Sequence, residues 1–567
     1  MGDTVKKKIS IGVEDFKEII EKDGYFVDKT LMIKKLIESQ AKVTLFTRPR
    51  RFGKTLNQFM IRRFFEDEIT EKGEKVDNGY LFDGLKIAEC GEEILKHQQQ
   101  YPVIFLTLKS AKQPTYEMAY ACLVDEICKE FERHSYVLAG EMPKRNRERF
   151  ERIQLGKGSR DEYAKALGFL SECLFKYHGK SAFILIDEYD VPLENAYFRG
   201  FYDEMIDFIR SLFESALKTN PYLEKSVITG CLRISKESIF TGLNNLKVDS
   251  VLRTEYGDSF GFTESEVEEM LAYYNLQEEL PEVKRWYDGY LFNDIEIYNP
   301  WSIINYVYDR DRKITKFALP YWSNSSSNSI IREMVGEADA DAKRDLETLI
   351  NGGTIEKQVH EDITYGDIHQ MQDNLWNFLF FTGYLKKAGE QKEGNNLKLE
   401  MKIPNIEIAT IYENSISYWF EQRIKETDRS PLVRALETGD CEAAEDFINR
   451  QLADTISYYD YAENFYHGFM AGLLVNIGGY SVKSNRESGN GRPDIVMQTV
   501  QVRKGRVILL EFKIAGSVAE MDAACDRGLA QIEEQHYAEP FITEGYPEVK
   551  KYALSFCKKE CMVKKAE

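Results

Sequence analysis

The segment TRPRRFGKT, residues 47–55, constrains the fold of this chain more than any other stretch. Its second half, Gly53-Lys54-Thr55, is that of the phosphate-binding loop G-x-x-x-x-G-K-[ST], but Arg48 stands where that loop has its first glycine. The apolar stretch AKVTLFT before it predicts a buried strand, and apolar residues at helical spacing from 56 to 64 predict a helix after it. Strand, glycine-lysine-threonine turn and helix are the context that a phosphate site requires.

The residue types of this loop suit the chemistry of a nucleotide. Gly53 allows close approach of the backbone to a phosphate, Lys54 adds a cation for the β and γ oxygens, and Thr55 offers a hydroxyl to Mg²⁺. Pro49, whose φ is fixed, can shape the start of the loop in place of the missing glycine.

A second half-site follows in FILIDEYD, residues 183–190, an apolar strand that ends in Asp187-Glu188. Asp187 at that position can hold Mg²⁺ through water, and Glu188 can orient or deprotonate the attacking water. A strand that ends in an acidic turn is common in isolation. Two half-sites in this order and context predict binding of ATP with Mg²⁺, and hydrolysis depends mainly on Glu188.

The strand KSVITG ends at Thr229, with Arg233 just beyond it. A polar residue at such a strand end can sense the γ-phosphate. A capping threonine and a surface arginine explain the same pattern equally well. Apolar strands that alternate with helix-patterned segments indicate a parallel sheet covered on both faces.

The last 160 residues predict a separate module with its own chemistry. LLEFKI places Glu511 and Lys513 two apart, on one face of a strand, and Asp494 starts the preceding strand, so a hairpin can bring it beside Glu511. Glutamate and lysine alternate on many solvated strands. Here the strand is apolar, and charges at the end of a buried strand need a reason. Carboxylates with a nearby cation suit hydrolysis of a phosphodiester with a divalent metal.

Composition limits the setting of the protein. No apolar run approaches the ~20 residues that span a bilayer. Nine scattered cysteines without a C-x-x-C pair favour reduced thiols in the cytoplasm. The net charge of −19 argues against a surface coated for non-specific binding of nucleic acid. Residues 48–65, however, contain six Lys and Arg side chains and no Asp or Glu.

Five segments together resemble the bacterial and archaeal AAA-ATPase-like family, whose members often end in a PD-(D/E)XK nuclease-superfamily domain: DGYFVDKT, TRPRRFGKT, FILIDEYD, FTGLNN and WYDGY…YNPWSI. Arg48 also belongs to the pattern of that family. The resemblance implies that Asp28, Lys29 and Thr30 lie near the nucleotide. It implies a helix acid, Glu463, and a glutamine, Gln531, at the nuclease site, with Glu487 as an alternative acid. His467 is expected to pack rather than to bind metal.

The fold expected from these features is α/β. It comprises an additional-strand P-loop ATPase domain (1–260), a helical or winged-helix-like middle region (261–404) and a restriction-endonuclease-like PD-(D/E)XK domain (405–567). The expected nucleotide site comprises Arg50, Arg51, Phe52, Gly53, Lys54, Thr55, Asp187, Thr229 and Arg233, with Glu188 as the base. The expected nuclease site comprises Glu463, Asp494, Glu511, Lys513 and Gln531, with Mg²⁺ or Mn²⁺.

The leading hypothesis is that ATP controls a nuclease that acts on nucleic acid, DNA in preference to RNA. A regulatory switch ATPase whose last domain binds nucleic acid or protein without cutting it is the main alternative. A remodeller of protein assemblies is the third, but it has no use for an intact Asp/Glu/Lys set. A homo-oligomer is compatible with all three, and the sequence does not set its size.

Overall fold

The computed structural model describes residues 6–233, 239–240, 245–253, 255–322, 331, 340–360, 372–393, 396–453, 463–475, 477–484, 488 and 491–566. The chain divides into two compact units. The first comprises Met1–Ser326 and Thr354–Thr410, and the second comprises Ser327–Gly353 and Ile411–Glu567. Within the described ranges, no helix combines the length and the apolar character needed to cross a membrane.

The first unit is built on a five-stranded sheet whose neighbouring strands are all parallel. The order is β2 (Val103–Thr107), β3 (Ala182–Asp187), β4 (Leu223–Gly230), β1 (Val43–Thr47) and β5 (Leu246–Asp249). Strand β4 separates the phosphate-loop strand β1 from the acidic strand β3, which is the additional-strand arrangement that the sequence predicted. Because parallel strands end at the same edge, the loops that follow β1, β3 and β4 meet there.

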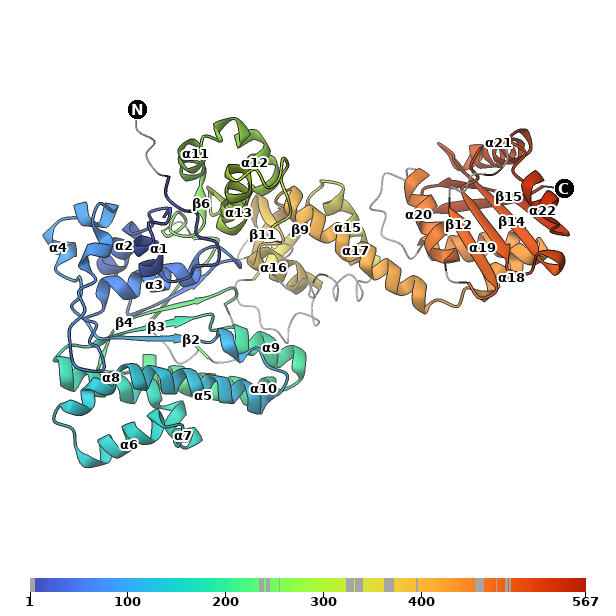
Figure 1. The fold of residues 1–567 in the computed structure, drawn as a ribbon. Coiled ribbons are helices and arrows are strands. Elements are labelled where there is room, and N and C mark those ends of the chain that lie inside the picture. The colour runs from blue at the N-terminus through green and yellow to red at the C-terminus, as the bar shows by residue number, and fades with distance from the viewer. Residues whose placement is uncertain are drawn as a thin grey trace. The chain divides into compact units, whose positions relative to one another are not determined.

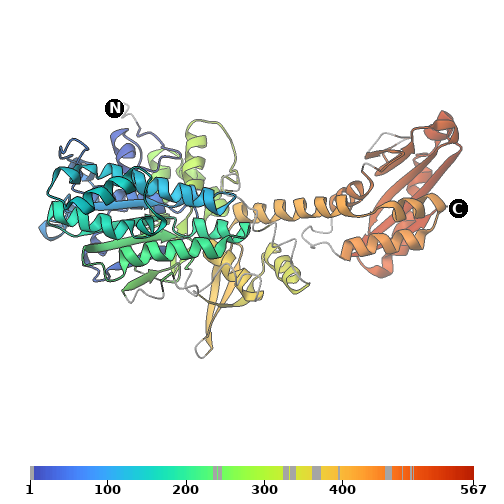
Figure 2. The same cartoon turned by 90° about the horizontal axis from the view of Figure 1, so that it is seen from below.

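Helices cover both faces of this sheet (Figure 1). Helix α3 (Lys54–Phe65) packs on β2, β3 and β4, with α1 (Phe16–Glu21) and α2 (Leu31–Glu38) on the same side. Three longer helices cover the other face and lie side by side in Figure 2: α5 (Tyr116–Arg133), α8 (Ala166–His178) and α10 (Tyr202–Leu217). The charged excursion predicted between 133 and 165 contains α6 (Lys144–Gln154) and α7 (Arg160–Ala164).

The middle region begins with β6 (Phe262–Thr263) and α11 (Glu264–Tyr273), where the predicted capping box of Thr263 and Glu266 is present. Helix α12 (Leu280–Tyr287), β7 (Tyr290–Phe292), β8 (Ile295–Tyr298) and α13 (Pro300–Asp311) follow. Strands β6, β7 and β8 form a small sheet of order β6-β8-β7. A second small sheet, of order β10-β11-β9, consists of β9 (Ile355–Val359), β10 (Lys386–Glu393) and β11 (Asn396–Lys402). Helix α16 (Gln372–Thr382) contacts β9. Helix α17 (Ile406–Glu426) leaves the region.

The second unit has a mixed sheet of order β12-β13-β14-β15-β16. Its strands are β12 (Tyr480–Ser484), β13 (Ile495–Thr499), β14 (Arg506–Ile514), β15 (Glu548–Cys557) and β16 (Glu560–Lys565). Only β14 and β15 pair in parallel, and β13 and β14 form the predicted hairpin. Its described helices include α15 (Ala340–Ile350), α18 (Ser430–Thr438), α19 (Cys441–Ala453), α20 (Glu463–Leu474), α21 (Met521–Glu534) and α22 (Glu539–Glu544).

The alternation of residues along β14 decides which side chains face which helices. Ile508, Leu510 and Phe512 belong to a core that α18, α19 and α20 complete. Val507 and Leu509 belong to the opposite core, which includes Ile532 of α21. Since side chains alternate along a strand, Glu511 and Lys513 share the α21 face with Val507 and Leu509.

Candidate nucleotide and nuclease sites

The phosphate loop has the geometry of an anion cradle. Gly53 adopts φ +80° at the N-cap of α3, a left-handed conformation that a residue with a Cβ adopts only with strain. Arg51, two residues earlier, is also left-handed, with φ +70°. The backbone thereby turns so that the first amides of α3 face the carboxyl edge of the sheet, where the helix dipole favours negative charge.

Lys54 is buried against its own loop. Its Nζ donates hydrogen bonds to the carbonyl oxygens of Arg48 (3.0 Å) and Pro49 (2.9 Å) and lies 3.6 Å from the sulfur of Cys231. The ammonium therefore lies against the backbone of the loop that precedes it.

Asp187 is the meeting point of the two half-sites. Thr55 Oγ1 donates to Asp187 Oδ2 at 2.7 Å, and Thr229 Oγ1 donates to Asp187 Oδ1. The side chain of Asp187 is buried, and its pKa is raised, because burial outweighs the lowering effect of the two hydroxyl hydrogen bonds. A hydroxyl and carboxylate oxygens at one point are the ligand types that Mg²⁺ prefers.

Glu188 follows with φ +52°, a left-handed conformation that turns the residue away from the strand direction. Burial, and then the charge of Asp187, raises the pKa of Glu188. A carboxyl with a raised pKa beside a phosphate site has the character of a general base.

Asp190 is a site residue that the sequence analysis missed. Its Oδ2 accepts hydrogen bonds from the backbone N–H groups of Cys231 (2.6 Å) and Leu232 (3.0 Å), so it shapes the loop that follows β4. The signal was the third acid in DEYD, residues 187–190. Arg233 comes next in that loop and is half-buried.

Arg48 does not face the phosphate space. Its guanidinium is buried, pairs with Asp249 at the end of β5 and donates from Nη1 to the carbonyl oxygens of Thr47 (2.9 Å) and Asp249 (2.8 Å). Its charge also lies over the rings of Phe260 (5.0 Å) and Phe292 (5.2 Å). The residue that replaces the glycine is thus an internal anchor of the loop.

The next three residues are also held by neighbours outside the loop. Arg50 Nη2 pairs with both carboxylate oxygens of Glu194 on α9 (Val191–Arg199). The Arg51 guanidinium lies 4.1 Å from the centre of the Trp301 ring on α13. Phe52 is buried against Tyr290 and Phe292 of β7.

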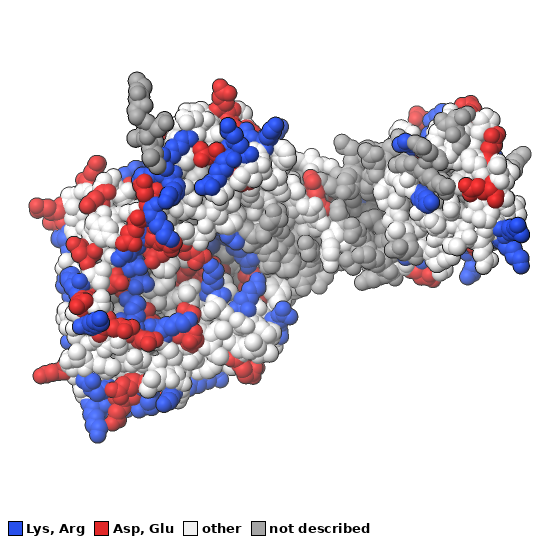
Figure 3. Space-filling model, viewed as in Figure 1, with Lys and Arg blue, Asp and Glu red and all other residues white. Residues whose placement is uncertain are grey.

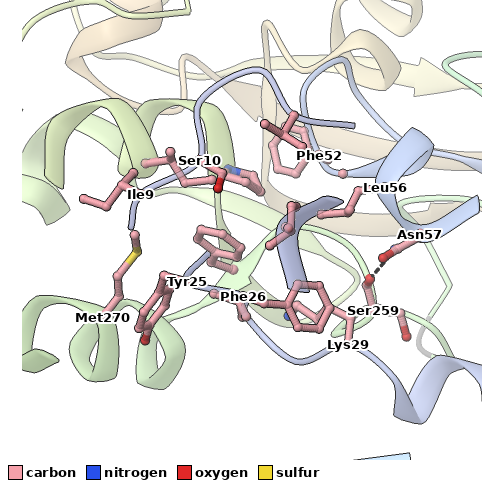
Figure 4. A pocket seen from close by; sticks show the side chains of 18 residues that line it. Ile9, Ser10, Tyr25, Phe26, Lys29, Phe52, Leu56, Asn57, Ser259 and Met270 are labelled. Atoms are coloured by element: carbon pink, nitrogen blue, oxygen red, sulfur yellow. Dashed lines mark hydrogen bonds between the residues drawn. The ribbon is translucent and has the colours of Figure 1, made fainter. Parts of the chain in front are cut away.

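An apolar cavity of about 90 Å³ adjoins the loop (Figure 4). Gly53 and Leu56 line it from α3, Phe26 and Lys29 from the N-terminal segment, and Met270 from α11. Lys29 forms an ion pair with Glu266 at 2.6 Å, which neutralises its charge. The segment Asp28-Lys29-Thr30 was expected near the nucleotide. One of its residues, Lys29, lines a cavity next to the phosphate loop.

Asp28 and Thr30 act on the chain rather than on that cavity. Asp28 Oδ2 accepts the N–H of Lys86 at 2.7 Å, and Thr30 Oγ1 accepts the N–H of Ile87 at 3.1 Å. Both anchor the short 3-10 helix Lys86–Glu89.

A cation at the end of β2 was also missed. Lys109 Nζ forms an ion pair with Glu14 Oε1 at 2.5 Å. Its pKa is raised: burial lowers it, but Glu14, and then Glu188 and Asp187, raise it by more, so its charge acts on the acidic end of β3. No local sequence pattern identifies Lys109 as a site residue. It lies near the site because β2 pairs with β3 in the sheet.

The hairpin of the second unit brings Asp494, Glu511 and Lys513 together. Ile495 pairs with Leu510, which places Asp494 opposite Glu511, and Asp494 Oδ2 accepts the N–H of Phe512 at 2.7 Å. Lys513 Nζ donates to Glu511 Oε1 at 2.9 Å.

Glu511 carries the feature that best fits a metal ion. Its side chain is 3% exposed, and its Oε2 is buried with no hydrogen-bond partner within the described structure. Burial, and then the charge of Asp494, raises the pKa of Glu511 to about 7. An orphaned buried carboxylate oxygen beside a second carboxylate is costly, and a bound divalent cation would satisfy both.

The other predicted nuclease residues are described only in part. Glu463 begins α20, but its side chain, like the whole of Glu487, lies outside the described residues. Gln531 Nε2 donates to the hydroxyl of Tyr537 at 3.3 Å. His467 Nε2 lies 3.1 Å from the carbonyl oxygen of Asp494 and 2.9 Å from Ser484 Oγ, so it contacts the backbone of the site. In the described parts of the chain, no three acidic, histidine or cysteine side chains form a ready metal cluster.

Comparison with known proteins agrees with this geometry. Residues 10–240 match the family described as "Predicted AAA-ATPase", and residues 461–566 match the PD-(D/E)XK nuclease superfamily. A protein of Azotobacter chroococcum mcd 1, described as "Uncharacterized protein in vnfD 5'region", is 25% identical over 570 residues, which cover 96% of this chain and 95% of that protein. The chain therefore carries an AAA-ATPase-like segment followed by a PD-(D/E)XK nuclease-superfamily segment, which confirms the architecture that its motifs predicted.

Proposed function

We propose that this protein binds and hydrolyses ATP and that its nucleotide state controls a metal-dependent nuclease in its second unit. The proposed substrate is nucleic acid, DNA in preference to RNA. The single observation that carries the nuclease half is the buried Oε2 of Glu511, which has no hydrogen-bond partner among the described residues, while Lys513 holds the other oxygen, Oε1. The nine cysteines are all free, which supports a reducing, cytoplasmic setting.

In the first unit, Lys54 would exchange the carbonyl oxygens of Arg48 and Pro49 for phosphate oxygens of ATP. Thr55 and Asp187 would hold Mg²⁺, which neutralises phosphate charge when bound. Glu188 would take the proton of the attacking water, and its raised pKa suits that task. Thr229 fixes Asp187 from the neighbouring strand.

The apolar cavity beside Gly53, at about 90 Å³, is smaller than a cavity that holds a single six-membered ring, so a purine would enter it only after the cavity widens. Among the described residues of its lining, the charged side chain is Lys29, which Glu266 neutralises.

In the second unit, Asp494 and Glu511 would hold a divalent cation, which activates water and polarises the phosphodiester when bound. Lys513 lies on the same strand face as Glu511, and its Nζ would orient the attacking water or stabilise the charge that develops on the phosphate. Gln531 would contact the substrate from α21.

On the face of the first unit seen in Figure 3, the exposed Lys and Arg side chains do not form one continuous basic patch. They are interspersed with Asp and Glu. On this face, nucleic acid would therefore meet interspersed charges of both signs.

One assay tests the proposal. Purified protein is incubated with plasmid, linear and single-stranded DNA and with RNA, in Mg²⁺ or Mn²⁺, with no nucleotide, ADP or ATP. Metal-dependent cleavage that changes with the nucleotide is the expected result. Retained binding without cleavage in either metal would favour the switch ATPase with a non-cutting domain.

A further inference from the structure

Arg51 is held between two anchored neighbours on the phosphate loop. Arg50 is tied to Glu194 of α9 through both carboxylate oxygens, and Phe52 is buried in the aromatic contacts of β7. With its backbone in the left-handed region, the Arg51 side chain leaves the loop in a different direction from both of them.

The direction is set by Trp301. The Arg51 Cζ lies 4.1 Å from the centre of the indole, the closest of the cation–ring contacts found among the described residues. The indole is itself fixed, because its Nε1 donates to the carbonyl oxygen of Tyr321 at 3.2 Å. The backbone N–H of Trp301 donates to Asn299 Oδ1 at 2.9 Å, which holds the start of the helix. Guanidinium groups commonly stack on aromatic faces, an arrangement in which their N–H groups donate from the edge, parallel to the ring.

The charges around Arg51 point toward the reacting end of the nucleotide site. Burial lowers the pKa of Arg51, and the carboxylates of Glu14 and then Glu188 raise it. Glu188 is the proposed base, and Glu14 pairs with Lys109 at the end of β2. The carboxylate of Glu188, where the attacking water would be held, is thus one of the charges that act on Arg51.

We propose that Trp301 is a positioning residue, which holds the Arg51 guanidinium at the phosphate loop so that its N–H edge meets the terminal phosphate of ATP. The proposal rests on the ATPase function proposed above and adds a residue of the middle region to it. Trp301 opens α13, so a change in the stack on loss of the γ-phosphate is passed directly to that helix.

This role differs from that of Arg48, which also contacts middle-region aromatics. The Arg48 guanidinium is wholly buried and paired, so it fixes the loop in every state. The Arg51 and Trp301 side chains are only half-buried, and their stack can therefore tighten or open with the nucleotide.

The test compares Trp301→Leu, which removes the aromatic face, with Trp301→Phe, which keeps a ring but loses the Nε1 hydrogen bond. Phe169→Leu is the matched control, because Phe169 stacks with Arg149 at 4.2 Å away from the site. We measure kcat and KM for ATP hydrolysis, and Kd for ATP and ADP by calorimetry. Tryptophan fluorescence is followed on addition of each nucleotide.

Trp301→Leu should lower kcat by about tenfold, which corresponds to loss of one oriented contact to developing charge, and leave the Kd of ADP within about twofold. Trp301→Phe and Phe169→Leu should stay within about threefold of wild type. Wild-type fluorescence should respond more to ATP than to ADP, and this difference should vanish in Trp301→Phe.

Equal kcat in wild type and Trp301→Leu, or equal loss in the Leu and Phe variants, would overturn the proposal. If Trp301→Leu does not fold, Arg51→Lys replaces it. Lysine keeps the charge without the planar fork, so kcat should again fall by about tenfold and the ATP-specific fluorescence change should disappear. An unchanged kcat in Arg51→Lys would also contradict the proposal. Failure of wild type to bind either nucleotide would instead remove the ATPase proposal itself.

Discussion

The Arg48 guanidinium and the Asp249 carboxylate form an ion pair that is closed to solvent, with side-chain exposures of 0% and 2%. Arg48→Met leaves Asp249 as a buried charge without its partner, and we expect it to lower the free energy of unfolding by about 3–5 kcal/mol. Urea denaturation followed by circular dichroism measures this.

The double variant Arg48→Met/Asp249→Leu should recover much of the loss, because it removes both charges. Lys165→Met is the control: its pair with Asp161 is exposed, and the change should cost less than about 1 kcal/mol. A cost for Arg48→Met no larger than that control would contradict the role of the buried pair.

Lys54→Ala should weaken ATP binding by about tenfold or more, because charge-assisted hydrogen bonds to phosphate contribute ~1.5–3 kcal/mol each. Calorimetric titration measures the affinity. Lys34→Ala, on the exposed face of α2, serves as the control and should bind ATP as wild type does. Unchanged affinity in Lys54→Ala would exclude the assignment.

Cleavage of nucleic acid should need Mg²⁺ or Mn²⁺ and should not occur with Ca²⁺, which accepts looser geometry. Lys513→Ala should abolish cleavage and keep metal binding, whereas Asp494→Ala should weaken both. Lys551→Ala is the control, since Lys551 pairs with Glu533 on the surface. Gel assays give cleavage, and titration with Mn²⁺ gives metal affinity. Full cleavage by Lys513→Ala would rule out its role.

Glu407 gives a pH-dependent stability. It is buried, accepts hydrogen bonds from Ser302 Oγ (2.7 Å) and the N–H of Trp322 (2.8 Å), and burial raises its pKa to about 7. The pKa of Glu407 is higher in the folded protein than in the unfolded chain. Its protonated carboxyl group therefore contributes fully to the free energy of unfolding below about pH 4.5, and this contribution is lost as the pH rises through about 7.

Glu407→Gln removes this titration while its amide can still accept from Trp322 and donate to Ser302. Relative to that variant, wild type should lose about 3 kcal/mol between pH 4.5 and 8, in urea unfolding of the full chain. Parallel pH profiles for the two proteins would show that Glu407 does not titrate in this range.

Coupling of the two units can be tested with Glu188→Gln, which keeps the shape of the side chain but removes the base. The variant should hold ATP without turnover. If ATP binding is sufficient for control, it should cut at least as well as wild type in ATP. If turnover moves the nuclease along its substrate, it should cut long DNA poorly and short DNA normally. Equal rates for apo, ADP, ATP and Glu188→Gln protein on all lengths would show that the units act independently.

The sequence alone determined the parts of both sites that depend on local pattern. The strand and helix around Gly53-Lys54-Thr55, the acids that end β3, and the alternation of Glu511 and Lys513 on β14 all follow from periodicities of two or 3.6 residues. The additional-strand fold followed from the order of these motifs and from the family resemblance.

Only the tertiary structure decided what the side chains contact. Arg48 stands where a glycine was expected, and its partner Asp249 lies 201 residues away. Likewise, the stack of Arg51 on Trp301 and the orphaned oxygen of Glu511 arise from strand order and register. Such contacts depend on which strands pair and on how the chain crosses between them. Local residue patterns do not encode that choice, because it is made by burial of the whole core.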